Sequence, residues 1–378
     1  MSDPMIAPYA ITMWDFSWLE RRWPGAGYED WDLVLDELVE RGYNAVRIDA
    51  YPHLVSADPT ATWELLPMWT QNTWGAQSII RVQVLPALIE FITKARDRGV
   101  AVALSSWFRQ DRADVRMKID SAAQMAAIWI DTLRVLAAAE LLDAVLYVDL
   151  CNEFPMAPYA PFLYGSAAGE AATRADPLIA SYMADSIALV RAEFPQLRYT
   201  YSFAGEYDNW RDQKVDELDF LEPHIWMASD DFTDFYERIG WSWDQFTPDS
   251  FDKLVALGRS TYFSKQHEYD SALFDAIDNV AAWSRATGKP VFTTECWAVT
   301  DYKDWPGLDW DWVLDLNARA VQHVVTTGRW LGIATSNFCG PQFHGVWREV
   351  DYHRRLTETI KSARIDADLV VAASWNRP

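Results

Sequence analysis

The order of secondary-structure patterns along the chain restricts its fold more than any other feature. Short runs rich in β-branched and aromatic residues alternate with longer amphipathic stretches. Strands that alternate with helices are typical of a parallel sheet with helices on both faces. Eight runs are expected to form strands: Tyr9–Trp14, Asn44–Ala50, Val100–Ser105, Ala144–Cys151, Arg198–Phe203, Asp219–His224, Pro290–Glu295 and Gly332–Asn337.

Helical patterns fill most of the intervals between these runs. In EDWDLVLDELVERG, the residues Trp31, Leu35 and Leu38 fall on one face, and Gly42 is a typical helix end. The segment 81–99 ends at a glycine in the same way, and longer patterns cover 119–140, 178–194, 249–287 and 311–328. The prediction of a helical crossover is weakest between the fifth and sixth runs, because only about fifteen residues connect them.

Eight strands with intervening helices predict an α/β fold, the closed (β/α)8 or TIM barrel. We expect a single domain over residues 1–378, with long aromatic-rich loops. An open doubly wound sheet is the competing architecture. It is disfavoured because MWDFSWLERRWPG, around the end of the first run, carries bulky side chains where a phosphate-binding turn needs glycine.

Charge and hydropathy exclude several classes of partner. The formal net charge is −22, from 55 acidic and 33 basic residues, and this field repels nucleic acid and anionic membrane surfaces. No run approaches the ~20 apolar residues of a membrane span. The N-terminus lacks the features of a signal peptide, and only Cys151, Cys296 and Cys339 are present, so we expect reduced thiols and a cytoplasmic location. The sequence does not indicate an oligomeric state.

The aromatic content is high, with 21 Trp, 16 Tyr and 17 Phe. A large core would explain part of it, but many of these residues stand in polar stretches such as TWELLPMWTQNTWG. Aromatic faces beside polar side chains suit a sugar, whose C–H face packs on a ring while its hydroxyls are hydrogen-bonded. We therefore expect a carbohydrate cleft with tryptophans in its wall: Trp63, Trp69, Trp74, Trp226, Trp241, Trp243, Trp297 and Trp305.

Polar residues stand where the expected strands end, which is where barrel enzymes carry their catalytic groups. Two of them, Glu153 and Glu295, follow the fourth and seventh runs and can face each other across a barrel mouth. Glycoside hydrolysis needs two such carboxylates, one to protonate the leaving oxygen and one to attack or to activate water. The residues at these ends are Arg47, Asp49, Trp107, Asn152, Glu153, Glu206, His224, Glu295 and Asn337.

The motifs NEFP and TTECW, at the ends of the fourth and seventh runs, resemble the paired signature of the cellulase-like glycoside hydrolases of family 5. The similarity extends to NAVRID, FLEPHIW and the C-terminal GPQFHGVWREVDYHRRLT. It implies a retaining β-glycosidase on a TIM barrel, acting on small glycosides or oligosaccharides through a glycosyl-enzyme intermediate. The six histidines show no metal-ligand spacing, so we expect neither a metal nor a cofactor.

The resemblance assigns roles to individual residues. Glu153 corresponds to the acid/base and Glu295 to the nucleophile. Asn152 would bond the sugar 2-hydroxyl, and His224 would line the site near the acid/base. Arg47 would keep the nucleophile ionised, because a nearby cation lowers a carboxyl pKa.

An alternative for Arg47 is a purely structural ion pair with Asp49 or Glu20. Cys151 and Cys296 adjoin the two glutamates, and we interpret them as small buried thiols beneath the site.

The sequence also departs from the family pattern. Phe154 separates the acid/base from Pro155, and Trp107 stands near the place of a strand-three histidine. Just after the sixth run, Trp226 stands where the family has a tyrosine, so its indole N–H would become the donor to the nucleophile. In the eighth run, Asn337 occupies the region where the family has a tryptophan. Together with Trp297, these residues are expected to contact substrate.

Two other functions remain open at this stage. A transglycosylase would use the same chemistry, with aromatic loops that exclude water. A non-catalytic sugar-binding barrel would keep the cleft, although it would not need two opposed carboxylates. The sequence does not identify the sugar.

Overall fold

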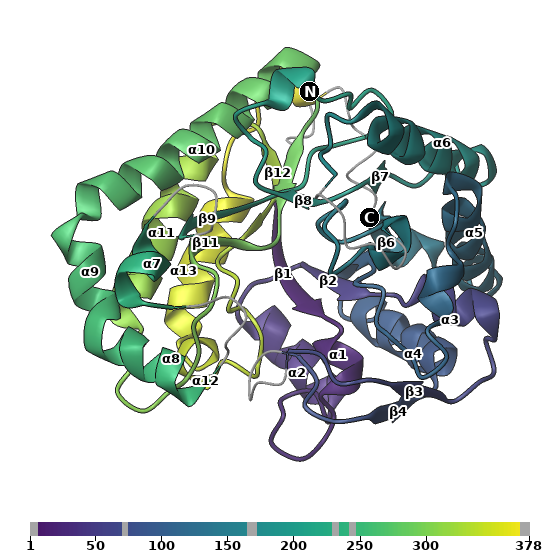
Figure 1. The fold of residues 1–378 in the computed structure, drawn as a ribbon, viewed down its shortest axis with the longest axis horizontal. Helices are drawn as coiled ribbons and strands as arrows, with labels where there is room; N and C mark the ends of the chain where they lie inside the picture. The colour runs from purple at the N-terminus through teal and green to yellow at the C-terminus, as the bar shows by residue number, and fades with distance from the viewer. Residues whose placement is uncertain (1–6, 70–74, 165–171, 229–233, 242–246, 371–378) are drawn as a thin grey trace.

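The computed structural model of the chain describes residues 7–69, 75–164, 172–228, 234–241 and 247–370. Trp74 and Trp243, two of the expected wall tryptophans, lie outside the described residues. Figure 1 shows strands at the centre of the molecule and helices around them. No helix in the described ranges is long and apolar enough to cross a membrane.

Seven parallel strands form most of the barrel wall, in the order β10-β12-β1-β2-β5-β6-β7. The first and last strands in the chain pair directly, with Tyr9 opposite Gly332. The bounds are β1 (Tyr9–Asp15), β2 (Ala45–Asp49), β5 (Ala101–Ser105), β6 (Val145–Asp149), β7 (Tyr199–Thr200), β10 (Val291–Thr293) and β12 (Trp330–Ala334).

Residues 203–228 close the barrel between β7 and β10. A parallel sheet of β8 (Phe203–Ala204), β9 (Pro223–Ala228) and β11 (Cys296–Val299) continues the wall there. Before β9 begins, the Asp219 amide donates to the carbonyl of Tyr199 at 2.9 Å, and the Leu221 amide donates to that of Pro290 at 3.0 Å. The predicted (β/α)8 barrel is thus confirmed. Its fifth strand is interrupted between β7 and β8, and its seventh strand is interrupted between β10 and β11. A separate antiparallel hairpin is formed by β3 (Trp63–Leu65) and β4 (Ile80–Val82).

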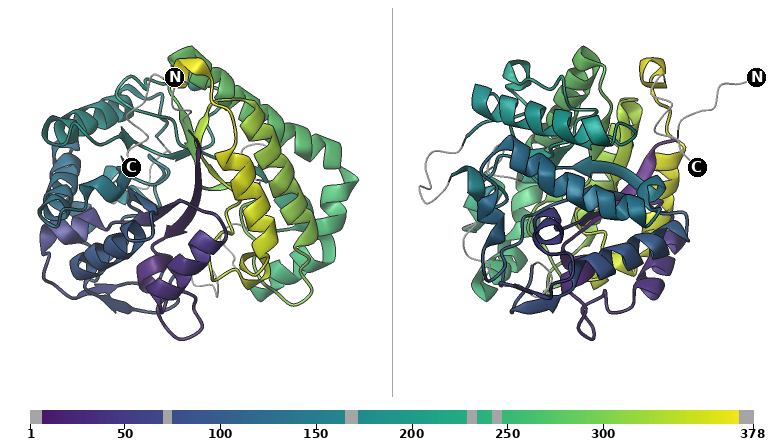
Figure 2. Two further views of the ribbon diagram at one scale, coloured as in Figure 1. Left: turned by 180° about the vertical axis from the view of Figure 1, so that it is seen from behind. Right: turned by 90° about the vertical axis from the view of Figure 1, so that its right-hand side faces the viewer.

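Helices surround the barrel, as Figure 2 shows from two further sides. The principal ones are α2 (Trp31–Glu40), α4 (Val84–Arg96), α5 (Ala122–Ala138), α6 (Pro177–Glu193), α10 (Gln266–Thr287), α11 (Asp311–Thr326) and α13 (Val350–Lys361). Shorter helices are α1 (Ser17–Glu20), α3 (Pro52–Ala57), α7 (Phe235–Ile239), α8 (Pro248–Lys253), α9 (Arg259–Ser264), α12 (His344–Trp347) and α14 (Ala367–Val370).

The helix α2 illustrates how local sequence sets these elements. The Asp30 carboxylate caps its start by accepting from the amides of Asp32 and Leu33. Its buried face carries Trp31 and Leu35, as the periodicity predicts. Gly42 follows the helix with φ +85°, a conformation that favours glycine.

Two predicted elements differ from the structure. The segment 249–287 is divided into α8, a π-helical turn (Leu254–Gly258), α9 and α10, with a break at Lys265, where φ is −137° and ψ is 31°. The sixth strand runs later than expected, because β9 ends at Ala228 and not at His224. The short crossover before it contains a single 3-10 turn (Trp210–Asp212), since its residues are too few for a helix with two loops.

Aromatic rings fill the barrel interior below the mouth. Tyr147, Phe220 and Phe292 pack together with ring centroids 4.7–5.2 Å apart, and all three are fully buried. The Tyr147 hydroxyl donates upward to Glu222 Oε1 at 3.0 Å. This cluster therefore joins the apolar barrel core to the polar groups above it.

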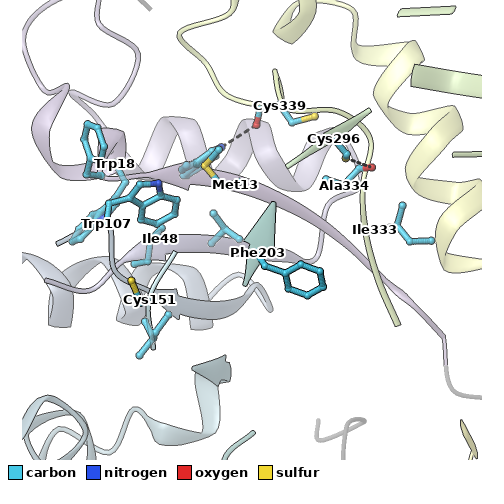
Figure 3. Packing of buried hydrophobic residues seen from close by; sticks show 14 of the residues in the cluster. Met13, Trp18, Ile48, Trp107, Cys151, Phe203, Cys296, Ile333, Ala334 and Cys339 are labelled. Carbon is cyan, nitrogen blue, oxygen red and sulfur yellow. Dashed lines mark hydrogen bonds between the residues drawn. The ribbon is translucent and has the colours of Figure 1, made fainter. Parts of the chain in front are cut away.

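The three cysteines are unpaired and buried, and the burial of Cys151 and Cys296 agrees with their interpretation as small buried thiols. Figure 3 shows Cys151, Cys296 and Cys339 among the packed hydrophobic side chains. The Cys296 thiol lies 3.7 Å from the carbonyl oxygen of Ala334. Burial raises the pKa of the Cys151 and Cys296 thiols well above the usual value, so these groups are weak nucleophiles.

We expect Gly332→Ala to destabilise the barrel. A Cβ at Gly332 would lie 2.0 Å from Cδ1 of Phe292, so the interior rings would have to move. Overpacking of this kind costs about 1–3 kcal/mol, which a lower urea midpoint would report. Gly258→Ala is the control, because its Cβ would meet its nearest atom, in Leu254, at 3.5 Å. If both variants keep the wild-type midpoint, this packing constraint is wrong.

Candidate active site

Arg47 on β2 is the centre of a buried polar network that reaches several other strands. Its side chain has no exposed surface. Nη2 donates to Asp149 Oδ2 at 2.5 Å and to Asn152 Oδ1 at 2.7 Å, while Nη1 donates to Glu295 Oε1 at 3.1 Å. Nε lies 3.4 Å from Glu222 Oε1. Arg47 thus holds groups from the fourth, sixth and seventh barrel strands in one place.

The alternative interpretation of Arg47 does not match these contacts. Asp49 instead accepts from the backbone amides of Tyr51 and Trp107. Glu20 pairs with Arg109, whose Nε lies 2.8 Å from Glu20 Oε1. Neither acid is an ion-pair partner of Arg47 in the structure.

Glu153 follows β6 in a left-handed backbone conformation, with φ +44°. Such a φ is unfavourable for a residue with a side chain, so surrounding contacts must hold it. Its amide donates to Ser202 Oγ at 3.0 Å, and the next amide, of Phe154, donates to the Ser202 carbonyl at 2.9 Å. Phe154 packs its ring 4.5 Å from that of Tyr201, which explains an apolar residue between Glu153 and Pro155. The turn thereby fixes the position of the Glu153 carboxylate.

Glu295 lies in the interruption between β10 and β11. Its carbonyl accepts from the Ile225 amide at 3.2 Å, which ties the interruption to β9. The preceding Thr294 accepts from Arg47 through Oγ1 at 3.2 Å. The break in the seventh strand thus places the Glu295 carboxylate beside the arginine.

The two glutamates meet at His224 on β9. His224 Nδ1 lies 2.9 Å from Glu153 Oε1 and 3.7 Å from Glu295 Oε1. One ligand atom from each of the three residues lies within 4.8 Å of the other two. The side chains of Glu153 and Glu295 are 7% and 10% exposed, and that of His224 is fully buried. The sequence-predicted pair is therefore assembled in a desolvated pocket.

Burial dominates the protonation of this cluster. It raises the pKa of Glu153 to about 7, against a hydrogen bond from Tyr159 that lowers it. It also raises the pKa of Glu295 to about 7, although His224 and Arg47 lower that value. Arg47 acts in the expected direction but does not by itself keep Glu295 ionised, because its charge is shared with Asp149 and Glu222.

Two protonation states follow from these values. Burial lowers the pKa of His224 to about 4, so its imidazole is neutral at pH 7. Two adjacent carboxyls with pKa values near 7 titrate as a pair, so that near this pH one proton is held between them. A proton donor and a carboxylate can then coexist in one site.

Asn152 presents an unused donor at the site. Its Oδ1 accepts from Arg47, which fixes the amide orientation. Its Nδ2 is buried and has no acceptor within reach in the ranges that the structure describes. A buried amide donor without a partner is costly, and an incoming hydroxyl would satisfy it.

The other expected contact residues occupy different environments. Trp107 contacts the central arginine, with the Arg47 guanidinium carbon 4.7 Å from the centroid of its ring. Trp226 packs edge-on to His224, and its Nε1 reaches no acceptor among the described residues, so it does not donate to Glu295 as expected. Asn337 binds through its backbone amide to the carbonyl of Cys296, next to Glu295.

Trp297 differs from the expectation of a cleft wall. It has no exposed surface, and its Nε1 donates to the carbonyl of Ala334 at 2.9 Å. A ring that stacks on sugar must offer a face to the solvent-filled cleft, so the structure places Trp297 in the core. Trp241 is likewise buried, and packs on Tyr236 and Phe251.

Trp69 is connected to the glutamates through one intervening side chain, that of Tyr159. It is partly exposed, and its ring centroid lies 6.0 Å from that of Tyr159, the hydrogen-bond partner of Glu153. Trp63 and Trp305 are also partly exposed. The three are the described wall candidates with an accessible ring.

Sequence reasoning missed four members of the site. Asp149 accepts from Ser105, Ser202 and Arg47, and Glu222 accepts from Tyr147 and Thr294. Tyr159 comes from the loop after β6. A charged residue inside an apolar run was the available signal for Asp149, whereas Ser202 and Tyr159 carry no local signal. Glu206, a strand-end acid, accepts from the Arg174 backbone amide at 3.1 Å.

Glu153, His224 and Glu295 also have the geometry of a three-ligand metal site. The Arg47 guanidinium, 3.1 Å from the Glu295 oxygen, opposes a second cation there. The expectation of no metal remains a prediction.

Comparison with solved structures identifies relatives of the same fold. A candidate glycoside hydrolase from Parabacteroides distasonis is 44% identical, with 98% of this chain and 99% of that chain covered and a TM-score of 0.94. A family 5 mannosidase from Rhizomucor miehei is 10% identical, with 94% of each chain covered and a TM-score of 0.54. An endocellulase from Pyrococcus horikoshii, solved with cellotetraose, is 11% identical, with 93% and 92% covered and a TM-score of 0.53.

At 10–11% identity, the last two similarities concern the fold alone. No curated protein matches the chain. The family model for sugar-binding cellulase-like proteins matches residues 11–361, which include every barrel strand except the first two residues of β1. This protein therefore belongs to the sugar-binding cellulase-like family, on a (β/α)8 barrel shared with glycoside hydrolases of family 5.

Proposed function

We propose that this protein is a retaining β-glycosidase, with residues 1–378 as a single catalytic domain. The observation that carries the proposal is the approach of Glu153 and Glu295, whose nearest oxygens lie within 4.8 Å with His224 between them. Retaining glycosidases hold their two carboxyl groups about 5–5.5 Å apart, whereas inverting ones need about 6.5–9.5 Å to admit a water. The spacing supports direct attack on the sugar.

In the first step, Glu295 attacks the anomeric carbon while Glu153 protonates the departing oxygen. The raised pKa of Glu153 supplies a proton at neutral pH. Arg47 stabilises the charge of Glu295 before attack, since its guanidinium lies against Oε1. His224, neutral and within hydrogen-bond distance of Glu153, orients the acid.

In the second step, Glu153 takes a proton from water, which releases the sugar from Glu295 with its original anomeric configuration. Asn152 donates its free amide hydrogens to the sugar 2-hydroxyl in both transition states. The substrate is a small carbohydrate with a β-glycosidic bond. Gluco- and manno-configured β-glycosides form the first panel for activity measurements, because cellulase and mannosidase relatives share the fold.

The two glutamates can be distinguished by chemical rescue. Glu153→Ala should still form the glycosyl-enzyme from a dinitrophenyl glycoside, whose leaving group needs no proton, and should then stall. Azide, which needs no base, should restore turnover and give the β-glycosyl azide. Glu295→Ala should lose roughly 10⁴-fold or more in kcat, and azide in its cavity should give the α-glycosyl azide. NMR of the azide products reads out each role.

Swapped anomers would reverse the two assignments. No rescue in either variant, with both folded by circular dichroism, would contradict double displacement at this pair.

The pH dependence of kcat/KM should be bell-shaped with its maximum near pH 7. Below that pH Glu295 becomes protonated and cannot attack, and above it Glu153 loses the proton that it must donate. Both carboxyls have pKa values of about 7, so the maximum should be narrow. A flat profile between pH 5 and 9 would show that this pair does not limit the reaction.

Tyr159→Phe should move the alkaline side of that profile more than the acid side. The Tyr159 hydroxyl donates to Glu153 and lowers its pKa, so its removal should raise that pKa and extend activity to higher pH. The expected displacement is roughly half a pH unit to one pH unit, the effect of one hydrogen bond. The acid side, to which Glu295 contributes, should move less, because the two carboxyls titrate as a pair. An equal movement of both sides, or a larger one of the acid side, would contradict the assignment.

A further inference from the structure

Arg174 carries a buried guanidinium that the proposed mechanism does not use. It stands just before α6 and has no exposed surface. Burial lowers its pKa to about 10, against the charges of Glu206 and Asp149, which raise it. Its Nη2 has no hydrogen-bond partner among the residues that the structure describes. Because a buried charge with an unsatisfied donor is costly, the contacts that this side chain does make need an explanation.

The guanidinium reaches the turn that carries the acid/base. Nη1 of Arg174 donates to the carbonyl oxygen of Phe154 at 3.1 Å, and Phe154 directly follows Glu153. A hydrogen bond from a charged donor is roughly twice as strong as one between neutral groups. Ser202 binds the amides of Glu153 and Phe154. The turn is therefore held through its N–H groups by Ser202 and through a carbonyl by Arg174.

Glu153 needs this support because of its backbone. Its φ is +44°, in the left-handed region. A residue with a side chain is strained there, and it relaxes to another conformation unless neighbouring contacts prevent it. The Glu153 carboxylate lies 2.9 Å from His224 Nδ1, so a change of φ at Glu153 would move the carboxylate away from this partner.

The fifth barrel strand and the loop after it fix Arg174 in turn. Its Nε donates to Gln213 Oε1 at 3.1 Å, and its backbone amide donates to Glu206 Oε2 at 3.1 Å. The side-chain amide of Gln213 donates to the carbonyl of Glu206 at 2.9 Å. The ring centroid of Phe203, on β8, lies 4.4 Å from the guanidinium carbon. These contacts hold both the backbone and the side chain of Arg174.

We propose that Arg174 is a positioning residue for Glu153, which it holds in place through the Phe154 carbonyl. It ties the turn after the fourth barrel strand to the loop after the fifth. Glu206, a strand-end acid without a role in the proposed chemistry, anchors the backbone of Arg174. The inference rests on the proposed glycosidase function for what Glu153 does, and on the contacts alone for where Glu153 lies.

The leaving group of the substrate tests this role. Phenolate needs a proton from Glu153 as it departs, whereas dinitrophenolate needs little. Arg174→Met keeps an apolar stem beside Phe203 but removes the donors. Its dinitrophenyl-to-phenyl ratio of kcat/KM should rise roughly tenfold or more over wild type, since misplacement of a catalytic group by about 1 Å can cost ~100-fold. A loss shared equally by both substrates would show a merely structural role and overturn the inference.

Two further variants set the scale of this ratio. Glu153→Gln removes the acid itself, so it should give the upper limit, roughly 10²–10⁴-fold above wild type. Gln213→Leu removes only the acceptor of Arg174 Nε, so it should raise the ratio by less than Arg174→Met does. If Arg174→Met does not fold, this milder variant decides, and a wild-type ratio in it would contradict the inference.

Arg329→Met is the matched control. Arg329 is also buried, donates through Nε to a side-chain oxygen (Ser284 Oγ, 2.9 Å) and through Nη2 to a backbone carbonyl (Ser284, 3.2 Å). It directly precedes β12, at the amino end of the barrel and away from the mouth. The ratio does not depend on the fraction of folded enzyme, so this variant should keep the wild-type ratio even if it is less stable. An equal rise in both arginine variants would overturn the inference.

Crystal structures separate this inference from the proposed function. In Arg174→Met, Glu153 should leave the left-handed conformation, or its carboxylate should lie more than about 3.5 Å from His224 Nδ1, beyond hydrogen-bond distance. Wild type and Arg329→Met should keep the contact. If wild-type protein hydrolyses no glycoside but this displacement occurs, the proposed function fails and the positioning role stands. An unmoved Glu153 in Arg174→Met would remove the role, whatever the activity.

Discussion

One buried guanidinium organises the site. Arg47 enters the barrel interior from β2 and contacts carboxylates from three other barrel strands: Asp149, Glu222 and Glu295. A buried cation is tolerated only when it is paired and hydrogen-bonded, and here each terminal nitrogen is. Because the partners belong to different strands, the same contacts that satisfy the charge fix the strands relative to one another. Removal of Arg47 would leave several acids buried without a cation.

The barrel supplies this network with a rigid frame. Interior rings such as Tyr147 and Phe292 pack below the polar layer, and Ser202 links the end of β6 to the following strand through both its hydroxyl and its carbonyl. Glu153 is held in a left-handed conformation by that link. The positions of the two glutamates are therefore set as much by the backbone of neighbouring strands as by the backbone of the strands that carry them.

The sequence was sufficient for the fold and for the pair of glutamates. Strand periodicity located β2, β6 and β10 to within a few residues, and the order of the strands placed Glu153 and Glu295 at one mouth. It could not give the contacts of Asp149, because its partners Arg47, Ser105 and Ser202 lie far from it in the sequence. It also could not distinguish Trp297, which is in the core, from Trp69, which is partly exposed, because both stand in stretches that mix apolar and polar residues.

The shared protonation of the site has a further consequence. Burial disfavours the carboxylate form of Glu153 and Glu295 because it removes water from these groups, and the charge of Arg47, shared with Asp149 and Glu222, offsets only part of that loss. The pair therefore holds a proton near neutral pH. Proton binding and ligand binding at one site are linked. A ligand that brings its own positive charge can therefore replace that proton, and it recovers the free energy that the proton supplied. In the proposed reaction the sugar ring becomes cationic as its bond breaks, and it is such a ligand. The buried pair therefore favours the charge that develops on the sugar during the reaction.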